Sequence, residues 1–186
     1  IIYIANTNGI IQYDGKFWEI VKISGTPCMN IDKAGTIYVG ANNDFGYISN
    51  SDITKPKFVS LIKSQNKLPL LKQIKQIYTF ENHVYFCNDK TLFKYTGKDV
   101  DIVDSCDEGI KLFKANEQVF LTKKGEGISK LINNEFRLIP GSIFFNNKDI
   151  IDILPFNGQL LIKTKKHTGF FLFDNYSVEP FHTEAD

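Results

Sequence analysis

The chain has 186 residues, of which 42% are hydrophobic and 13% aromatic, enough to bury a core of its own. Its 22 basic and 21 acidic residues leave a formal charge of +1, and Arg137 is the only arginine. This balance argues against nucleic acid or an anionic membrane as partner, because both are bound through a field of positive charge.

Short apolar segments repeat along the chain. Apolar triplets are centred on Tyr3, Tyr38, Tyr85, Phe120 and Leu161, at spacings of 35, 47, 35 and 41 residues. After each triplet come two more strand-like pieces, the first at 9–13, 45–48, 91–95, 127–131 and 169–173, the second at 17–20, 57–61, 100–103, 135–139 and 177–181. A further apolar piece, as at 28–31 and 150–154, lies between repeats. Short pieces rich in Ile, Val, Phe and Tyr, bounded by turn residues, indicate antiparallel strands.

Four strands per repeat and a period of about 40 residues predict an all-β fold, the β-propeller. We expect one domain over 1–186, a partial ring of about five four-stranded blades with an incomplete first blade, cut from a longer chain at both ends. The expected blade segments are 1–21, 27–62, 73–104, 110–140 and 149–182. A two-sheet sandwich is the alternative, and the even period favours the propeller.

Two corners carry hairpin signals, Asp14-Gly15 and Asn157-Gly158, because these pairs readily adopt positive φ angles. The longest interval between triplets contains an insertion at 50–72. Residues 68–77 space Leu71, Ile74 and Ile77 like a helix, but Pro69 favours a short loop helix or an extended linker.

Parts of the sequence resemble a known repeat. Residues 2–15 (IYIANTNGIIQYDG), followed by Trp18, resemble the regulator-propeller repeat of sensor proteins from Bacteroidetes-type bacteria. Residues 35–47 (GTIYVGANNDFGY) resemble the second blade of regulators that join a propeller to a triple-tyrosine immunoglobulin-like domain, and 169–174 with 180–186 resemble a later blade. The third and fourth repeats depart from this pattern at 88–90 and 124–127.

The resemblance implies the periplasmic or extracellular sensor part of an inner-membrane regulator. A membrane helix and a histidine kinase or helix-turn-helix output domain follow in that family, and the full-length sensor is expected to form a homodimer. This segment itself is not expected to contact nucleic acid.

Residues that could perform chemistry are scattered. His83, His167 and His182 lie far apart on predicted corners, and Asp149 and Asp152 share one apolar strand, whereas glycoside hydrolysis needs carboxylates facing across a cleft. Gly125-Glu126-Gly127 lacks the features of a phosphate loop, and residues 42–44 lack the glutamate of a calcium loop. We therefore expect no enzyme, cofactor or metal in this segment. A propeller lyase or glycosidase remains the less favoured alternative.

The three cysteines, Cys28, Cys87 and Cys106, have no metal-ligand spacing. Cys28 and Cys87 are expected in the core and Cys106 in a polar loop, and the redox state stays open.

The corners between the second and third strands of each repeat are polar. They supply the candidate ligand-binding residues, namely Asn6, Asn8, Asn42, Asn43, Asp44, Lys124 and Lys166. In a propeller these corners share one face with the blade connections. Amides suit sugar hydroxyls, so a small molecule or oligosaccharide is the expected ligand. A protein-interaction or purely structural propeller is the alternative, in which these corners are only solvated.

Overall fold

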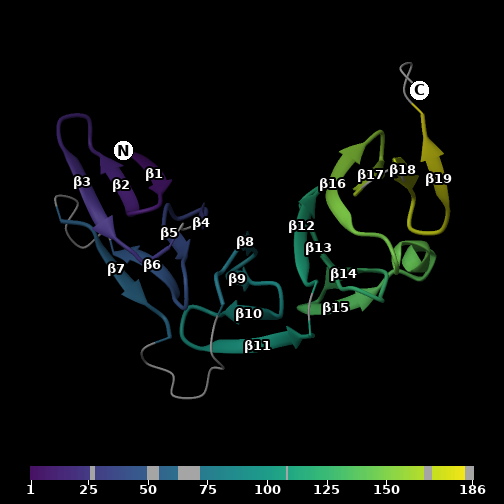
Figure 1. Ribbon diagram of the computed structural model, residues 1–186, viewed down its shortest axis with the longest axis horizontal. Coiled ribbons are helices and arrows are strands. Elements are labelled where there is room, and N and C mark those ends of the chain that lie inside the picture. Colours follow the sequence, from purple (N-terminus) through teal and green to yellow (C-terminus); the bar gives the residue numbers. More distant parts are fainter. Residues whose placement is uncertain (26–27, 50–54, 63–71, 108, 166–168, 183–186) are drawn as a thin grey trace. The chain divides into compact units, whose positions relative to one another are not determined.

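The computed structural model describes residues 1–25, 28–49, 55–62, 72–107, 109–165 and 169–182. It contains nineteen strands in these residues, arranged in five antiparallel sheets in which strand order follows chain order. The chain forms two compact units, Ile1–Ser105 and Cys106–Asp186. The first unit holds three sheets and the second holds two (Figure 1).

The first unit begins with a three-stranded sheet, and its other two sheets have four strands each. The first sheet contains β1 (Ile2–Asn6), β2 (Gly9–Tyr13) and β3 (Trp18–Lys22). The second contains β4 (Cys28–Ile31), β5 (Ile37–Gly40), β6 (Phe45–Ser49) and β7 (Lys57–Ser60), and the third β8 (Gln76–Phe80), β9 (His83–Cys87), β10 (Thr91–Tyr95) and β11 (Val100–Ser105). A register shift lies between Leu92 and Phe93.

The second unit has two four-stranded sheets and one short helix. Its sheets are β12 (Lys111–Ala115), β13 (Gln118–Thr122), β14 (Ile128–Ile132) and β15 (Glu135–Leu138), then β16 (Ile150–Phe156), β17 (Gln159–Thr164), β18 (Phe170–Phe173) and β19 (Val178–Phe181). The 3-10 helix η1 (Pro140–Phe145) connects them. We did not expect η1 from the sequence, although proline at its start fits the first turn of a helix.

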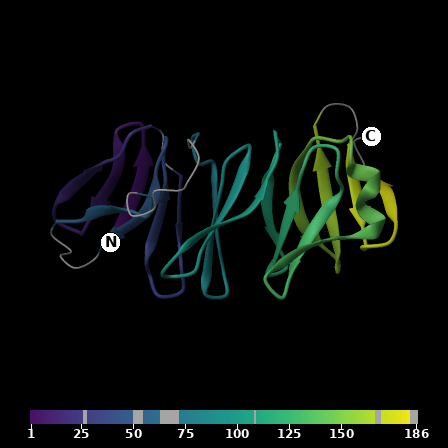
Figure 2. The same ribbon diagram turned by 90° about the horizontal axis from the view of Figure 1, so that it is seen from below.

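Consecutive sheets within each unit pack face to face. In the first unit, Ile10 and Val21 of the first sheet pack with Val39 and Ile48 of the second. Figures 1 and 2 show the strands of these sheets. The other face of the second sheet packs on the third sheet, where Phe45 stacks on Phe86 with ring centroids 4.4 Å apart. In the second unit an apolar cluster that includes Phe120 and Ile162 joins the two sheets.

The first strands of neighbouring sheets lie together, β4 with β8 in the first unit and β12 with β16 in the second. The Asn30 side chain of β4 donates to the Ile77 carbonyl of β8 at 2.7 Å. Four-stranded antiparallel sheets that stack face to face, with their first strands adjacent, are propeller blades. The predicted all-β propeller class with an incomplete first blade is confirmed, and the sandwich is not observed.

Both hairpin signals are confirmed, with different turns. Asn157 and Gly158 have φ of 47° and 82° and join paired residues Phe156 and Gln159. The corner at Asp14 is longer, because Tyr13 pairs with Trp18. There the Asp14 carboxylate accepts the N–H groups of Lys16 and Phe17, both at 2.7 Å.

Most of the insertion at 50–72 falls outside the described residues, as does 68–71 of the helix or linker expected at 68–77. Residues 72–75 have no regular structure, and β8 begins at Gln76. Within the described ranges, no helix is long and apolar enough to cross a membrane.

Candidate functional site

The polar corners and the connections between sheets meet at one end of each sheet, as expected. In the second sheet, the Asn42 N–H donates to the Ser24 carbonyl of the preceding connection at 3.1 Å. Ala41 in the same corner accepts the N–H of Ile74, in the following connection, at 3.0 Å. In the second unit, the Gly125 N–H donates to the Asn146 carbonyl at 3.0 Å. These backbone hydrogen bonds from the corners therefore fix the path of the connections between sheets.

Some asparagine side chains in the corners accept hydrogen bonds from the backbone of their own corner. The side-chain oxygen Oδ1 of Asn6 accepts a hydrogen bond from the Asn8 backbone N–H at 2.7 Å. Asn88, which is buried, accepts the N–H groups of Lys90 and Thr91, each at 2.8 Å. These bonds use side-chain acceptors to satisfy turn backbone, which is the common role of asparagine at corners. Sequence reasoning treated Asn6 as a ligand residue and missed this structural role.

Residues 42–44 present two exposed amide side chains and one carboxylate that is hydrogen-bonded within the sheet. Asn42 and Asn43 are exposed, and Asn43 has a φ of 57°, a left-handed conformation that asparagine tolerates. Asp44 is half-buried, and its carboxylate accepts a hydrogen bond from the Ser60 hydroxyl at 2.7 Å. The side chains best placed to meet a ligand in this unit are therefore those of Asn42 and Asn43, together with the exposed Asn8.

The expected lysines belong to the second unit. Lys124 is exposed in the corner after β13, where its neighbour Lys123 forms an ion pair with Glu126 at 3.0 Å. Lys166 and His167 lie outside the described residues. The candidate amides thus come from one unit and Lys124 from the other.

The two aspartates considered for catalysis have structural partners. Asp149 forms ion pairs with Lys111 at 2.5 Å and Lys165 at 3.7 Å, and the Lys111 hydrogen bond lowers the pKa of this carboxyl. Asp152 accepts the N–H of Ile153 at 2.9 Å. His83 is half-buried at the start of β9, and His182 is exposed. In the part of the chain that the structure describes, no three His, Cys, Asp or Glu side chains are grouped to hold a metal ion.

The three cysteines are free thiols. Cys87 is buried, as expected, whereas Cys28 and Cys106 are half-buried. Burial raises the pKa of the Cys28 thiol to about 11, which keeps it protonated and unreactive at neutral pH.

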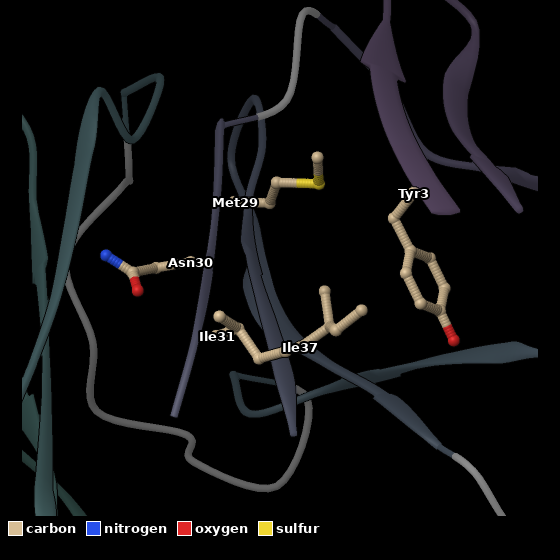
Figure 3. A pocket seen from close by; sticks show the side chains of 5 residues that line it. All are labelled: Tyr3, Met29, Asn30, Ile31 and Ile37. Atoms are coloured by element: carbon tan, nitrogen blue, oxygen red, sulfur yellow. The ribbon is translucent and has the colours of Figure 1, made fainter. Parts of the chain in front are cut away.

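A hollow of about 390 Å³ lies beside the first strands of the first unit. It is lined by Tyr3 of β1, Met29, Asn30 and Ile31 of β4, and Ile37 of β5. Figure 3 shows Met29 and Ile37 directed toward Tyr3, whereas Asn30 points away. The lining is mainly apolar, and no corner residue among the candidates contributes to it.

The outer face of the first sheet is also apolar and open. Cross-strand register places two rows on it, Ile2 with Tyr13 and Trp18, and Ile4 with Ile11 and Ile20. Trp18 is 60% exposed and stacks on Tyr13 with ring centroids 4.4 Å apart. Contiguous apolar surface of this kind is a common feature of interaction faces. The alternating apolar pattern of this face can be read from the sequence, but its exposure to solvent cannot.

Known structures with the same fold include extracellular domains of bacterial proteins. Two structures of the BT4673 extracellular domain from B. thetaiotaomicron match 97% of this chain at 14% identity, with TM-scores of 0.64 and 0.63. BT4673 is described as a candidate one-component system in one and a candidate hybrid two-component system in the other. PorZ of Porphyromonas gingivalis, a surface component of the type-IX secretion system, matches 98% of the chain at 10% identity and a TM-score of 0.62.

At these identities the comparison shows the fold. The chain spans about a quarter of the length of the solved chains, 26% of the BT4673 extracellular domain and 25% of PorZ. No protein-family model matches the chain, and no curated protein matches it. Membership of the regulator-propeller family therefore stays a prediction.

Proposed function

We propose that this chain is part of an extracellular or periplasmic sensing domain of a bacterial membrane regulator, and that the domain binds a small molecule or an oligosaccharide. The observation that carries the proposal is the structural match to the BT4673 extracellular domain over 97% of this chain. Signalling would follow when ligand shifts the balance between two arrangements of a homodimer, which requires different affinity for the two arrangements.

In the first unit, the ligand contacts would come from the exposed amides at the corner ends. Asn42 and Asn43 stand on a corner whose backbone is tied to Ser24 and Ile74, so their positions are fixed by the sheet and not by a free loop. Amide groups both donate and accept hydrogen bonds, which suits the hydroxyl groups of a sugar. Preorganised polar groups lose little entropy on binding.

Calorimetric titration of the 186-residue chain with a panel of oligosaccharides tests the ligand. The double variant Asn42→Ala, Asn43→Gly removes both exposed amides, and glycine preserves the left-handed backbone at position 43. We expect binding of at least one panel member to weaken about tenfold, which corresponds to about 1.4 kcal/mol.

The matched control is Asn134→Gly, at a residue with a φ of 66° in the hairpin between β14 and β15. It makes the same chemical change away from the corner ends and is expected to leave binding unchanged. If no oligosaccharide binds, or if both variants weaken binding equally, the corner site is wrong. We also expect no turnover of the panel, which thin-layer chromatography of the incubated sugars would check.

A protein-interaction role is the second candidate, favoured by the open apolar face that contains Trp18 and Ile20. PorZ is itself described as a surface component of a secretion system. Light scattering would reveal association through this face as a molecular mass above that of one 21.2 kDa chain. Trp18→Ser would restore the monomer if this face forms the contact.

A further inference from the structure

The connection between the two sheets of the second unit carries a lysine that lies against aromatic rings. The Lys148 Nζ atom is 4.6 Å from the centroid of the Phe144 ring and 5.5 Å from that of Phe171. Within the described residues, no carboxylate forms an ion pair with Lys148. Contact with aromatic faces attracts an ammonium group, but it does not neutralise its charge.

Backbone hydrogen bonds hold this connection between two corners of the second unit. The Asn146 carbonyl accepts the Gly125 N–H at 3.0 Å, and the Asp149 carbonyl accepts the Lys165 N–H at 2.8 Å. The backbone is therefore fixed on both sides of Lys148. A side chain that starts from a fixed backbone loses less entropy when it binds a ligand.

Other exposed groups on the same segment complement the ammonium group. Phe144, at the end of η1, is 46% exposed, and aromatic rings suit the apolar faces of sugar rings. Asn147 is exposed, and its amide can both donate to and accept from hydroxyl groups. Lys165 is exposed, and its ion pair with Asp149 is long, at 3.7 Å. An aromatic ring, an amide and two ammonium groups match a sugar that carries a carboxylate.

The charge of this end of the second unit favours an anion. Two of its acidic residues, Glu126 and Asp149, already form ion pairs with Lys123 and Lys111. Five lysines and three acidic residues lie in the described corners and connections here, which are residues 106–107, 109–111, 123–127, 146–149 and 165. A negatively charged ligand would gain from this local excess of positive charge, and a neutral one would not.

We propose that the corner end of the second unit binds the carboxylate of an acidic oligosaccharide, an oligomer of uronic acids. Lys148 is the counter-ion of the carboxylate, the exposed part of the Phe144 ring contacts the sugar ring, and the Asn147 amide bonds to its hydroxyl groups. This inference rests on the proposed oligosaccharide binding and names the kind of sugar. Its contacts differ from those of Asn42 and Asn43 in the first unit.

The test is calorimetric titration of the 186-residue chain with oligomers of galacturonate, mannuronate and glucuronate. Each is compared with its methyl ester, which keeps the sugar and removes the charge. At about 0.1 M salt, we expect at least one acid to bind about tenfold more tightly than its ester. Most of this difference should disappear at about 1 M salt, where charges are screened beyond about 3 Å.

Two variants of the chain locate the contact. Lys148→Gln removes the ammonium group and keeps a long polar side chain, and it is expected to weaken binding of the acid about tenfold. The matched control is Lys98→Gln, at an exposed lysine in the turn between β10 and β11, at the opposite end of its sheet from the corners. It should leave binding unchanged. Circular dichroism checks that both variants fold.

Three results would overturn the proposal. One is equal binding of the acids and their esters, or no binding of any acid. The second is an equal effect of the two variants. The third is binding of polyglutamate as tightly as the acidic sugars, because the site would then recognise carboxylates without a sugar ring. Neutral sugars that bind while the acids do not would leave the proposed function in place, whereas failure of every sugar would contradict both.

Discussion

Gly25, in the connection that leaves the first sheet, packs directly against Asn42, in a corner of the second sheet. A Cβ atom on Gly25 would stand 2.9 Å from the Asn42 Cβ, and the Gly25 φ is +87°. The same relationship occurs in the second unit, where a Cβ on Gly109 (φ +86°) would lie 3.0 Å from the Lys124 Cβ. Both candidate ligand residues are thus positioned by a glycine that another residue could not replace without strain.

Gly25→Ala is expected to destabilise the chain through two effects. A left-handed backbone costs a non-glycine residue about 1–2 kcal/mol, and the contact with Asn42 adds a steric cost of about 1 kcal/mol or more. Urea unfolding followed by circular dichroism would measure the loss.

Gly35→Ala is the matched control, because Gly35 has a similar φ of +85° with nothing within 4 Å of its Cβ position. It should show the backbone cost alone. Equal losses of stability in the two variants would mean that the close contact between Gly25 and Asn42 adds no steric cost.

The strands could be predicted from sequence because each carries an apolar pattern bounded by turn residues. The triplet 37–39 lies in β5, and the apolar piece at 150–154 forms the start of β16. The same pattern predicted that the polar corners and the connections between sheets lie at one end of each sheet, since the second and fourth strands of an antiparallel sheet run in the same direction. The 3-10 helix η1 was missed because its residues, PGSIFF, lack a helical repeat of useful length.

The site was harder to predict because side-chain partners come from distant segments. Sequence reasoning could not separate Asn6, whose oxygen is used by its own turn, from Asn42, which is exposed. The hollow depends on residues 3, 29–31 and 37, brought together by sheet packing.

Ser142 in η1 is expected to be a strong determinant of stability in the second unit. It is fully buried, and its hydroxyl accepts the Ile128 N–H at 2.7 Å and contacts the Ile139 carbonyl at 2.6 Å. Ser142→Ala leaves a buried N–H without this partner, at a cost of about 1–3 kcal/mol. Ser129→Ala, at a half-buried residue of β14 next to Ile128, is the control for urea unfolding. A loss no greater than that of the control would contradict this role.

Alkaline pH is expected to destabilise the first unit through Tyr38. Burial, followed by the nearby Asp32 carboxylate, raises the pKa of Tyr38 to about 12 from an ordinary value of 10.0. The folded state therefore holds the proton more tightly than the unfolded state, so its contribution is complete below pH 10 and is lost as pH rises toward 12.

Urea unfolding at pH 8, 10 and 11.5 would measure this loss, and Tyr38→Phe should make it smaller. Tyr85, whose pKa burial also raises to about 12, leaves a residual dependence in that variant. An unchanged alkaline loss in Tyr38→Phe would show that Tyr38 does not contribute.

Asp149 is expected to stabilise the junction between β12 and β16 at neutral pH. Its carboxylate pairs with Lys111, which also donates to the Ile150 carbonyl at 2.9 Å. The hydrogen bond from Lys111 lowers the pKa of Asp149 below 3.8, so this contribution is present above that pH and is lost as pH falls through the lowered value. Both side chains are partly exposed, at 34% and 48%, so solvent screening limits the contribution to about 1 kcal/mol or less.

Asp149→Asn should lower the free energy of unfolding at pH 7 and should have a smaller effect at pH 2, because the native carboxyl becomes protonated as pH falls through its lowered pKa. Glu117→Gln is the control, since it breaks the Lys114–Glu117 pair, whose carboxylate is 86% exposed. Because an exposed pair contributes little, its loss at pH 7 should be the smaller of the two. A difference between Asp149→Asn and the native chain that is the same at both pH values would mean that the effect is not carried by the carboxylate charge. Lys111 would then hold β16 through the Ile150 carbonyl alone.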